Sequence, residues 1–225
     1  MNRIHKDTFA QPEKMNLREL ISDWFVKGDG NFLDFYGNGD MVRHLFLDKK
    51  IDTSRIYAVE HNKRRAKKML SFPKINKYFG TVRNYAAIAS ERGITFRCAW
   101  LDYCGPISRE MIGDAAAIMP TVDMGGMMIL TLLAARERHR QAQGHEAREI
   151  AYPIHVLDAA VNSKLKFELQ FKAFYSGKHK QTTMLVLGFK RIKTASAYVQ
   201  KVMAMPSVLT AGDTNGLRVV GTFGK

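Results

Sequence analysis

The chain has 225 residues, 46% of them hydrophobic and 25% charged, a balance that excludes a largely disordered protein and suits one core with appendages. Lys and Arg number 35 against 21 Asp and Glu, and the resulting net charge of +14 attracts polyanions. Nucleic acid is therefore the expected partner. A basic surface that binds nothing is the alternative.

Cysteine content and hydropathy indicate the cellular compartment of the protein. Two cysteines, Cys98 and Cys104, are too few for a disulfide framework or a four-ligand zinc site, so we expect no metal. The polar N-terminus lacks the apolar core of a signal peptide. The most apolar stretch, 115–135, is interrupted by Pro120 and Asp123, which argues against a membrane span. We expect a soluble, cytoplasmic protein with no membrane partner.

The first part of the chain alternates helices and strands. Apolar residues between Leu17 and Phe25 recur at helical spacing, and Gly28 marks the end of that helix. The predicted elements that follow are a strand over 31–36, a helix over 41–46, a strand over 55–60 and a helix over 62–70. Strands separated by helices are joined by right-handed crossovers, which predicts a parallel sheet.

The second part continues the alternation and then changes. The predicted elements are strands over 78–82, 94–101 and 127–133, helices over 85–92 and 146–161, and strands over 165–171 and 183–189. Pro153 is expected to break the second helix. The last two strands have no helix between them and must pair antiparallel. The fold class is thus α/β: a Rossmann-like, mostly parallel sheet with a C-terminal antiparallel hairpin.

This pattern divides the chain into three parts. Residues 1–28 form an N-terminal helical extension, 29–193 the central domain, and 194–225 a C-terminal helix and tail. The last part of the tail is rich in Gly, Thr and Asn, so we expect that end to be poorly ordered unless something holds it. The C-terminal region is also where we expect any protein partner to dock.

A glycine turn directly follows the first strand. Ligands of open parallel sheets bind beyond the carboxyl ends of the strands, and glycine lets the backbone approach them closely. The turn supplies five candidate cofactor residues: Asp34, Tyr36, Gly37, Asn38 and Gly39. An ordinary strand-to-helix turn is the alternative interpretation, because a lone Gly-x-Gly is weak.

Two further residues are candidates for a nucleoside cofactor. Glu60 ends the second strand, where a carboxylate can accept hydrogen bonds from both ribose hydroxyls. A Glu that merely complements the dipole of the next helix is the alternative. Asn84, near the end of the third predicted strand, can hydrogen-bond an adenine.

This arrangement resembles the class I S-adenosylmethionine (SAM) methyltransferases. The acidic residue and Gly-x-Gly turn are similar to their first motif, especially the Tyr-Cys-Gly-Asn-Gly form of some RNA uridine methyltransferases, with one residue fewer. The resemblance implies that Asp34 lies near the methionine part of SAM, that Gly37 and Gly39 contact the cofactor, and that Glu60 holds the ribose. Tyr36 stands where a glycine is frequent.

In this family the end of the fourth strand faces the transferred methyl group. Asp102 and Tyr103 occupy that position and resemble the polar and aromatic members of the Asp-Pro-Pro-Tyr motif of amino methyltransferases, without its paired prolines. They are the implied catalytic residues. Cys104 stands near the place of the nucleophile of cytosine C5 enzymes, although a packed structural thiol is the alternative.

Basic residues gather in three regions. The candidate nucleic-acid contacts are Lys63, Arg64, Lys67, Arg136, Lys178 and Lys180. Phosphate contacts need many such side chains, and aromatic residues near them can stack unpaired bases. A run on one helix can also be a solvated face, so it is the accumulation of basic residues over three regions that favours nucleic acid.

Three functions fit these observations. The leading hypothesis is a SAM-dependent methyltransferase acting on nucleic acid, RNA ahead of DNA. The second is a non-catalytic relative that binds nucleic acid within a transcription or replication assembly, which Tyr36 and the missing prolines favour. The third is a small-molecule or protein methyltransferase, against which the charge argues. The fold alone cannot decide among them.

Overall fold

A computed structural model describes residues 12–72, 74–103, 105–134, 145–176, 183–193 and 218–221. Its centre is one eight-stranded sheet with strand order β3-β2-β1-β4-β5-β7-β6-β8. The strands are β1 (Asn31–Phe35), β2 (Ile56–Glu60), β3 (Asn76–Phe79), β4 (Phe96–Asp102), β5 (Val122–Leu133), β6 (Phe167–Ser176), β7 (Thr183–Arg191) and β8 (Arg218–Gly221).

The sheet has a parallel half and an antiparallel half. β1 lies between β2 and β4, parallel to both, and Asp34 is in register with Ala58 on one side and Trp100 on the other. The outer strands β3 and β5 continue this parallel half. β7 pairs antiparallel with both β5 and β6. The predicted fold class is confirmed: a mostly parallel sheet closed by an antiparallel hairpin.

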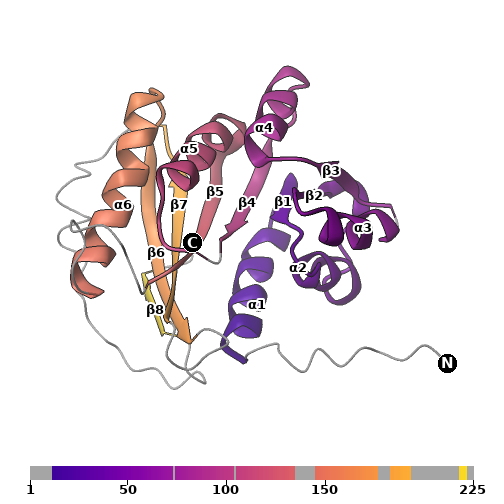
Figure 1. Cartoon of the computed structure of the whole chain (residues 1–225), viewed down its shortest axis with the longest axis horizontal. Helices are drawn as coiled ribbons and strands as arrows, with labels where there is room; N and C mark the ends of the chain where they lie inside the picture. Colours follow the sequence, from indigo (N-terminus) through magenta and orange to yellow (C-terminus); the bar gives the residue numbers. More distant parts are fainter. Residues whose placement is uncertain are drawn as a thin grey trace.

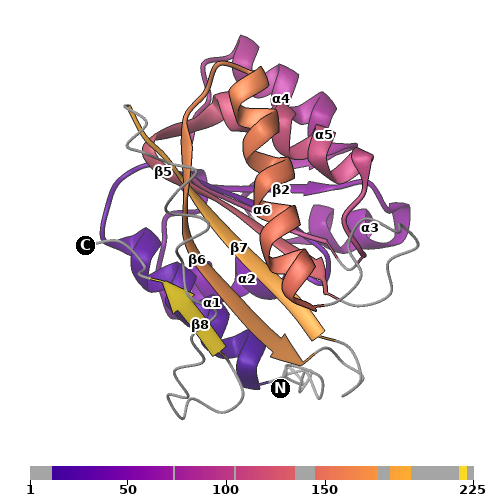
Figure 2. The same cartoon turned by 90° about the vertical axis from the view of Figure 1, so that its left-hand side faces the viewer.

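Helices cover both faces of the sheet (Figures 1 and 2). They are α1 (Pro12–Val26), α2 (Asp40–Arg43), α3 (Lys63–Ser71), α4 (Val82–Glu91), α5 (Arg109–Ile118) and α6 (His145–Asn162), with the π-helix η1 (His44–Asp48) and the 3₁₀ turns η2 (Thr53–Arg55) and η3 (Met119–Thr121). Buried residues of α1, α2 and α3 pack on one face, and those of α4, α5 and α6 pack on the other. No helix in the described ranges is long and apolar enough to cross a bilayer.

The N-terminal helix belongs to the core. Leu17, Ile21 and Phe25 on α1 are fully buried, and the Phe25 ring meets Phe32 of β1 edge-to-face at 5.1 Å. Burying each such side chain contributes roughly 1.5–3 kcal/mol. α1, which lies in the segment expected to be an N-terminal extension, therefore packs against one face of the sheet.

The predicted elements differ from the structure in several places, and β5 begins at Val122 rather than at Met127. Pro153 does not break α6, because buried neighbours such as Tyr152 and Val156 hold both sides of it against the sheet. β3 ends at Phe79, and Val82 already begins α4. The sequence interpretation missed α5 altogether. The first half of α2–η1 is α-helical, but its second half winds as a π-helix.

One part of the predicted tail, β8, is paired with the sheet. β8 pairs antiparallel with β6, from Phe171↔Gly221 to Phe174↔Arg218. This pairing gives the strand the backbone partners that an isolated tail lacks. The predicted helix after Thr194 lies outside the described residues.

Candidate cofactor and acceptor site

One cavity opens at the carboxyl ends of β1, β2 and β4. Its volume is about 570 Å³, within the range of about 300–1,000 Å³ that small-molecule sites occupy. Asp34, Glu60 and Asp102, which end or nearly end these three strands, all line it. The parallel register explains this convergence, because neighbouring strands finish at the same edge.

The turn after β1 needs its glycines. Gly37 and Gly39 have φ angles of 51° and 77°, in the left-handed region that residues with a Cβ enter at a cost. α2 begins immediately afterwards at Asp40, and the Arg43 amide donates to the Gly39 carbonyl at 2.9 Å. Gly37 and Asn38 line the cavity, so the turn lies beside any ligand there.

Tyr36 is accommodated beneath this turn. A Cβ added at Gly39 would lie 2.6 Å from Tyr36 Cζ, so the ring packs directly against the glycine. The hydroxyl donates to the Lys68 carbonyl of α3 at 3.3 Å, and burial raises the pKa of Tyr36. The residue is 2% exposed. Tyr36 lines the cavity, but the space for a ligand remains.

Asp34 is a buried carboxylate without a hydrogen-bond donor among the described residues. It is 2% exposed and lines the cavity. Burial first, and the charge of Asp102 second, raise the pKa of Asp34 well above its usual value, while Arg18 and Lys14 oppose the shift. A cationic ligand in the cavity would stabilise the ionised form of Asp34.

Glu60 lines the cavity at the end of β2, the strand next to β1. Its side chain is 5% exposed, and Oε1 accepts from the Asn62 amide at 2.7 Å. The Gly80 amide donates to the Glu60 carbonyl at 3.0 Å and brings the loop before α4 to the same place. Gly80 and Thr81 of this loop, and Val82 and Arg83 at the start of α4, line the cavity.

Asn84 is not brought to the cavity. It lies in the first turn of α4, where its amide donates to the Thr81 hydroxyl at 3.3 Å, and its side chain is exposed. The cavity is lined instead by the residues just before it, because α4 begins earlier than the sequence predicts. Its expected contact with adenine has no support in this position.

Asp102 is paired at the end of β4. Lys14 of α1 donates to Asp102 Oδ2 at 2.6 Å, while Oδ1 is buried and has no hydrogen-bond partner among the described residues. One turn along α1, Arg18 donates to Asp40 Oδ2 at 2.8 Å. Lys14 and Arg18 line the cavity, although neither was predicted as a site residue from the sequence. Their four-residue spacing on one helix was the only signal for them.

Tyr103 is held at both ends of its ring. Its hydroxyl donates to Asp114 Oδ2 at 2.8 Å, and its ring meets Phe35 edge-to-face at 5.0 Å. Burial first, and the charge of Asp114 second, raise the pKa of Tyr103. Both Tyr103 and Asp114 line the cavity. The hydroxyl stays protonated and already has an acceptor.

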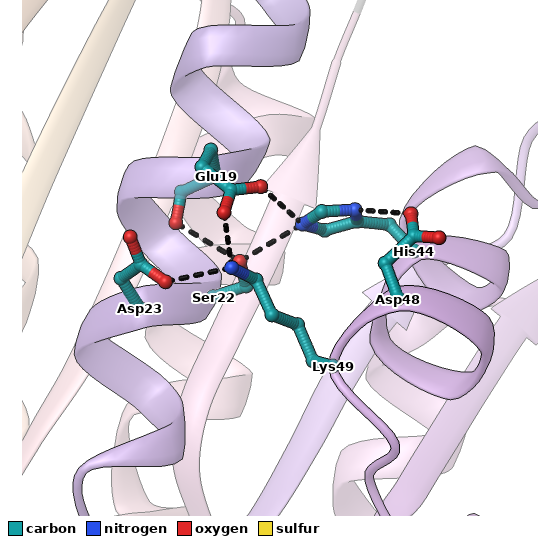
Figure 3. A network of polar contacts seen from close by, with 6 residues as sticks. All are labelled: Glu19, Ser22, Asp23, His44, Asp48 and Lys49. Carbon is teal, nitrogen blue, oxygen red and sulfur yellow. Dashed lines mark hydrogen bonds and ion pairs between the residues drawn. The ribbon is translucent and has the colours of Figure 1, made fainter.

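A polar network fastens α1 to the segment after the glycine turn (Figure 3). His44 Nε2 contacts the Ser22 hydroxyl at 2.9 Å, and its Nδ1 lies 2.8 Å from Asp48 Oδ2. Lys49 donates to Asp23 Oδ1 at 2.7 Å and also pairs with Glu19. These contacts hold α1 in the position from which Lys14 and Arg18 reach the cavity.

The basic residues of α3 form an exposed face beside the cavity. Lys63, Arg64 and Lys67 are exposed and make no ion pair with another described residue. Arg65, on the same helix, is exposed and also lines the cavity. The other predicted contacts, Arg136, Lys178 and Lys180, lie outside the described residues, as does Cys104. No three His, Cys, Asp or Glu residues in the described part of the chain could hold a metal.

Comparison with known proteins identifies the fold. No family model and no curated protein matches the sequence. An rRNA methylase from Streptococcus thermophilus superposes with a TM-score of 0.50 at 12% identity, over 81% of this chain and 97% of its own. The N-methyltransferase NodS from Bradyrhizobium japonicum superposes with a TM-score of 0.54 at 13% identity, over 82% of this chain and 99% of its own.

A third solved structure adds a bound ligand. The plantazolicin methyltransferase BamL, in complex with a triazolic desmethylPZN analog and SAH, superposes with a TM-score of 0.55 at 9% identity, over 82% of this chain and 86% of its own. Identities this low show the fold alone. The chain therefore has the class I methyltransferase fold.

Proposed function

We propose that the protein is a SAM-dependent methyltransferase that acts on nucleic acid. The observation that carries this proposal is the convergence of Asp34, the Gly37–Gly39 turn, Glu60 and Asp102 on one cavity of about 570 Å³. The fold and the volume both suit a nucleoside cofactor. The SAH in the BamL complex supports the same choice of ligand.

The residues of the cavity fit the groups of this cofactor. Asp34, buried and without a hydrogen-bond donor among the described residues, would stabilise its positive charge. Glu60 would accept from the ribose hydroxyls, and the left-handed glycines leave room for close approach. When bound, SAM supplies an electrophilic methyl group on its sulfonium.

The β4 end of the cavity supplies the acceptor side. Asp102 Oδ1, buried and unpaired among the described residues, would accept a hydrogen bond from the N–H or O–H that receives the methyl. Lys14 fixes the other carboxylate oxygen, so the free one is held in place. Holding the acceptor in a fixed orientation lowers the activation barrier of methyl transfer, because the entropy of alignment is lost on binding and not in the reaction step.

Nucleic acid is the proposed substrate because of charge. The chain carries +14, and α3 presents exposed basic residues next to the cavity that make no ion pair with another described residue. Counterion release from phosphates would drive binding. RNA is placed ahead of DNA, which agrees with the rRNA methylase among proteins of the same fold.

A specific observation also favours a second function. Lys14 already neutralises one oxygen of Asp102, and Tyr103 already donates to Asp114, so both predicted catalytic residues have partners. A relative that only binds nucleic acid would tolerate such an arrangement. Methyl transfer distinguishes the two functions.

Two measurements on the full chain test the proposal. Calorimetry should detect binding of SAM and of SAH, and radiolabelled SAM should transfer its methyl to total RNA or to genomic DNA. No binding at millimolar ligand would contradict the enzyme. SAM and RNA binding without transfer would support the binding protein instead.

A further inference from the structure

Asp114 connects two elements that line the cavity. Its Oδ2 accepts from the Tyr103 hydroxyl at 2.8 Å, and its Oδ1 accepts from Arg83 Nε at 2.7 Å. Arg83 also donates to the Glu110 carbonyl at 2.7 Å. The carboxylate of Asp114 is 14% exposed, so it is largely sheltered from water. One side chain thus joins the loop after β4 to the start of α4.

The surface of α5 is shaped to receive Arg83. A Cβ at Gly113 would lie 2.4 Å from Arg83 Nη2, so the guanidinium rests directly on the helix at this glycine. Glycine inside a helix costs roughly 0.5–1 kcal/mol relative to alanine. Ser108 caps α5 by accepting from the Met111 amide at 3.2 Å, which fixes where the helix begins. The surface against which the Arg83 guanidinium packs is therefore formed by α5.

These contacts determine what Tyr103 can contribute. Its hydroxyl is occupied by a carboxylate acceptor, and Phe35 meets its ring at an interplanar angle of 84°. Two anchors of different chemistry fix the ring in one orientation beside Asp102. Tyr103 therefore acts through the position of its ring, and Asp114 controls that position.

We propose that Asp114, itself held by Arg83, is a positioning residue that fixes the Tyr103 ring at the acceptor end of the cavity. The inference rests on the proposed methyl transfer. Arg83 lies in the first turn of α4, directly after the loop in which the Gly80 amide donates to the Glu60 carbonyl, so the same link ties the cofactor end to the acceptor end. Displacements of about 1 Å in such an arrangement can cost about 100-fold in rate.

The test compares Asp114→Ala with Asp114→Asn, in wild type and in a Tyr103→Phe background. The assay is methyl transfer from radiolabelled SAM to total RNA and genomic DNA, with SAM affinity measured by calorimetry. We expect Asp114→Ala to lower kcat roughly 10- to 100-fold with SAM affinity unchanged. Asp114→Asn keeps one acceptor oxygen and should therefore lower kcat less than Asp114→Ala does. Asp158→Ala, an exposed carboxylate of α6, is the control.

The background variant decides the mechanism. In Tyr103→Phe the hydroxyl is gone, so Asp114→Ala should have little further effect on kcat. An equal loss in both backgrounds would overturn the inference, since Asp114 would then act independently of Tyr103. A drop in SAM affinity that accounts for the whole loss would overturn it as well. Wild type without any transfer would refute the proposed function and the inference together, a result distinct from either of these.

Discussion

The cofactor end and the acceptor end of the cavity are built in different ways. At the cofactor end the backbone does the shaping: left-handed glycines turn the chain, and Asp34 is buried with no hydrogen-bond donor among the described residues. At the acceptor end side chains hold one another, with Lys14 on Asp102 and Asp114 on Tyr103. Asp34 at the first end makes no ion pair with another described residue, whereas Asp102 and Tyr103 at the second end already have their contacts.

This difference separates binding from orientation. An uncompensated buried carboxylate is costly until a ligand supplies charge or donors, so the cofactor end gains most from being filled. A network of paired side chains gains little from a ligand but keeps its groups aligned. Damage at the first end should therefore lower affinity, and damage at the second should lower rate.

The largest effect is expected at Asp102. Asp102→Ala removes the free Oδ1 acceptor and should lower methyl transfer about 100- to 10,000-fold, with SAM affinity nearly unchanged. Single-turnover transfer and calorimetry measure the two quantities separately. Asp158→Ala on α6 controls for the loss of one carboxylate. Equal transfer by wild type and Asp102→Ala would refute the placement of the acceptor end.

Glu60 should show the opposite behaviour. Glu60→Ala removes a carboxylate that would accept from the cofactor, and should weaken SAM binding by roughly 1.5–3 kcal/mol, the scale of a charge-assisted hydrogen bond. At saturating SAM the rate should recover. Glu91→Ala, at the exposed end of α4, is the matched control. Unchanged affinity would remove Glu60 from the cofactor site.

The basic face of α3 tests the substrate. Lys63→Glu, Arg64→Glu and Lys67→Glu together should weaken RNA binding and reduce the slope of log K against log salt by about 2–3, since each phosphate contact contributes roughly 0.7–0.9. SAM affinity should not change. The scattered triple Lys27→Glu, Lys50→Glu and Arg92→Glu changes the charge equally and is the control. Equal losses of RNA affinity in both triple variants would show that α3 makes no specific contact and that only the overall charge of the protein matters.

The two ends also differ in how far the sequence predicts them. Asp34, the glycine turn and Glu60 lie in short strand-to-helix segments, where hydropathy and glycine position follow local rules. The same rules gave the parallel sheet and the closing hairpin. Local patterns are sufficient when the site is made by the backbone at the end of a strand.

The contacts of the acceptor end are not local. Lys14 and Asp102 are 88 residues apart, and Arg83 and Asp114 are 31 apart. Such pairs depend on how helices dock on the sheet, which no short pattern encodes. The missed helix α5 carries Asp114, so the link from Tyr103 to Arg83 could not be foreseen. Tertiary packing likewise overrode the expected break at Pro153.

The burial of the Asp34 carboxyl predicts a dependence of stability on pH. In the unfolded chain its pKa is near 3.8, and burial raises it well above that value in the folded protein. Between the two values the folded protein keeps a proton that the unfolded chain has lost. The free energy of unfolding therefore falls as the pH rises through this window.

Asp34→Asn removes this titration. Relative to wild type, the variant should gain stability as the pH rises from below 3.8 to above the raised pKa, and denaturant unfolding at a series of pH values measures the difference. Asp158→Asn, on the exposed side of α6, controls for the loss of one charge. A stability difference that stays constant with pH would show that Asp34 is not a buried, uncompensated acid.

The smallest effect concerns the glycine turn. Gly39 and Gly125 have nearly equal φ angles, 77° and 80°, so Ala at either position should cost about 1–2 kcal/mol through the backbone alone. A Cβ at Gly125 meets nothing within 4 Å, whereas one at Gly39 would lie 2.6 Å from Tyr36 Cζ. Gly39→Ala should therefore lower the Tm more than Gly125→Ala. Because the excess comes from the ring, it should vanish in a Tyr36→Ala background. If the two glycines cost the same even beside the intact ring, Tyr36 would not support the turn, and the backbone alone would hold the cofactor end in shape.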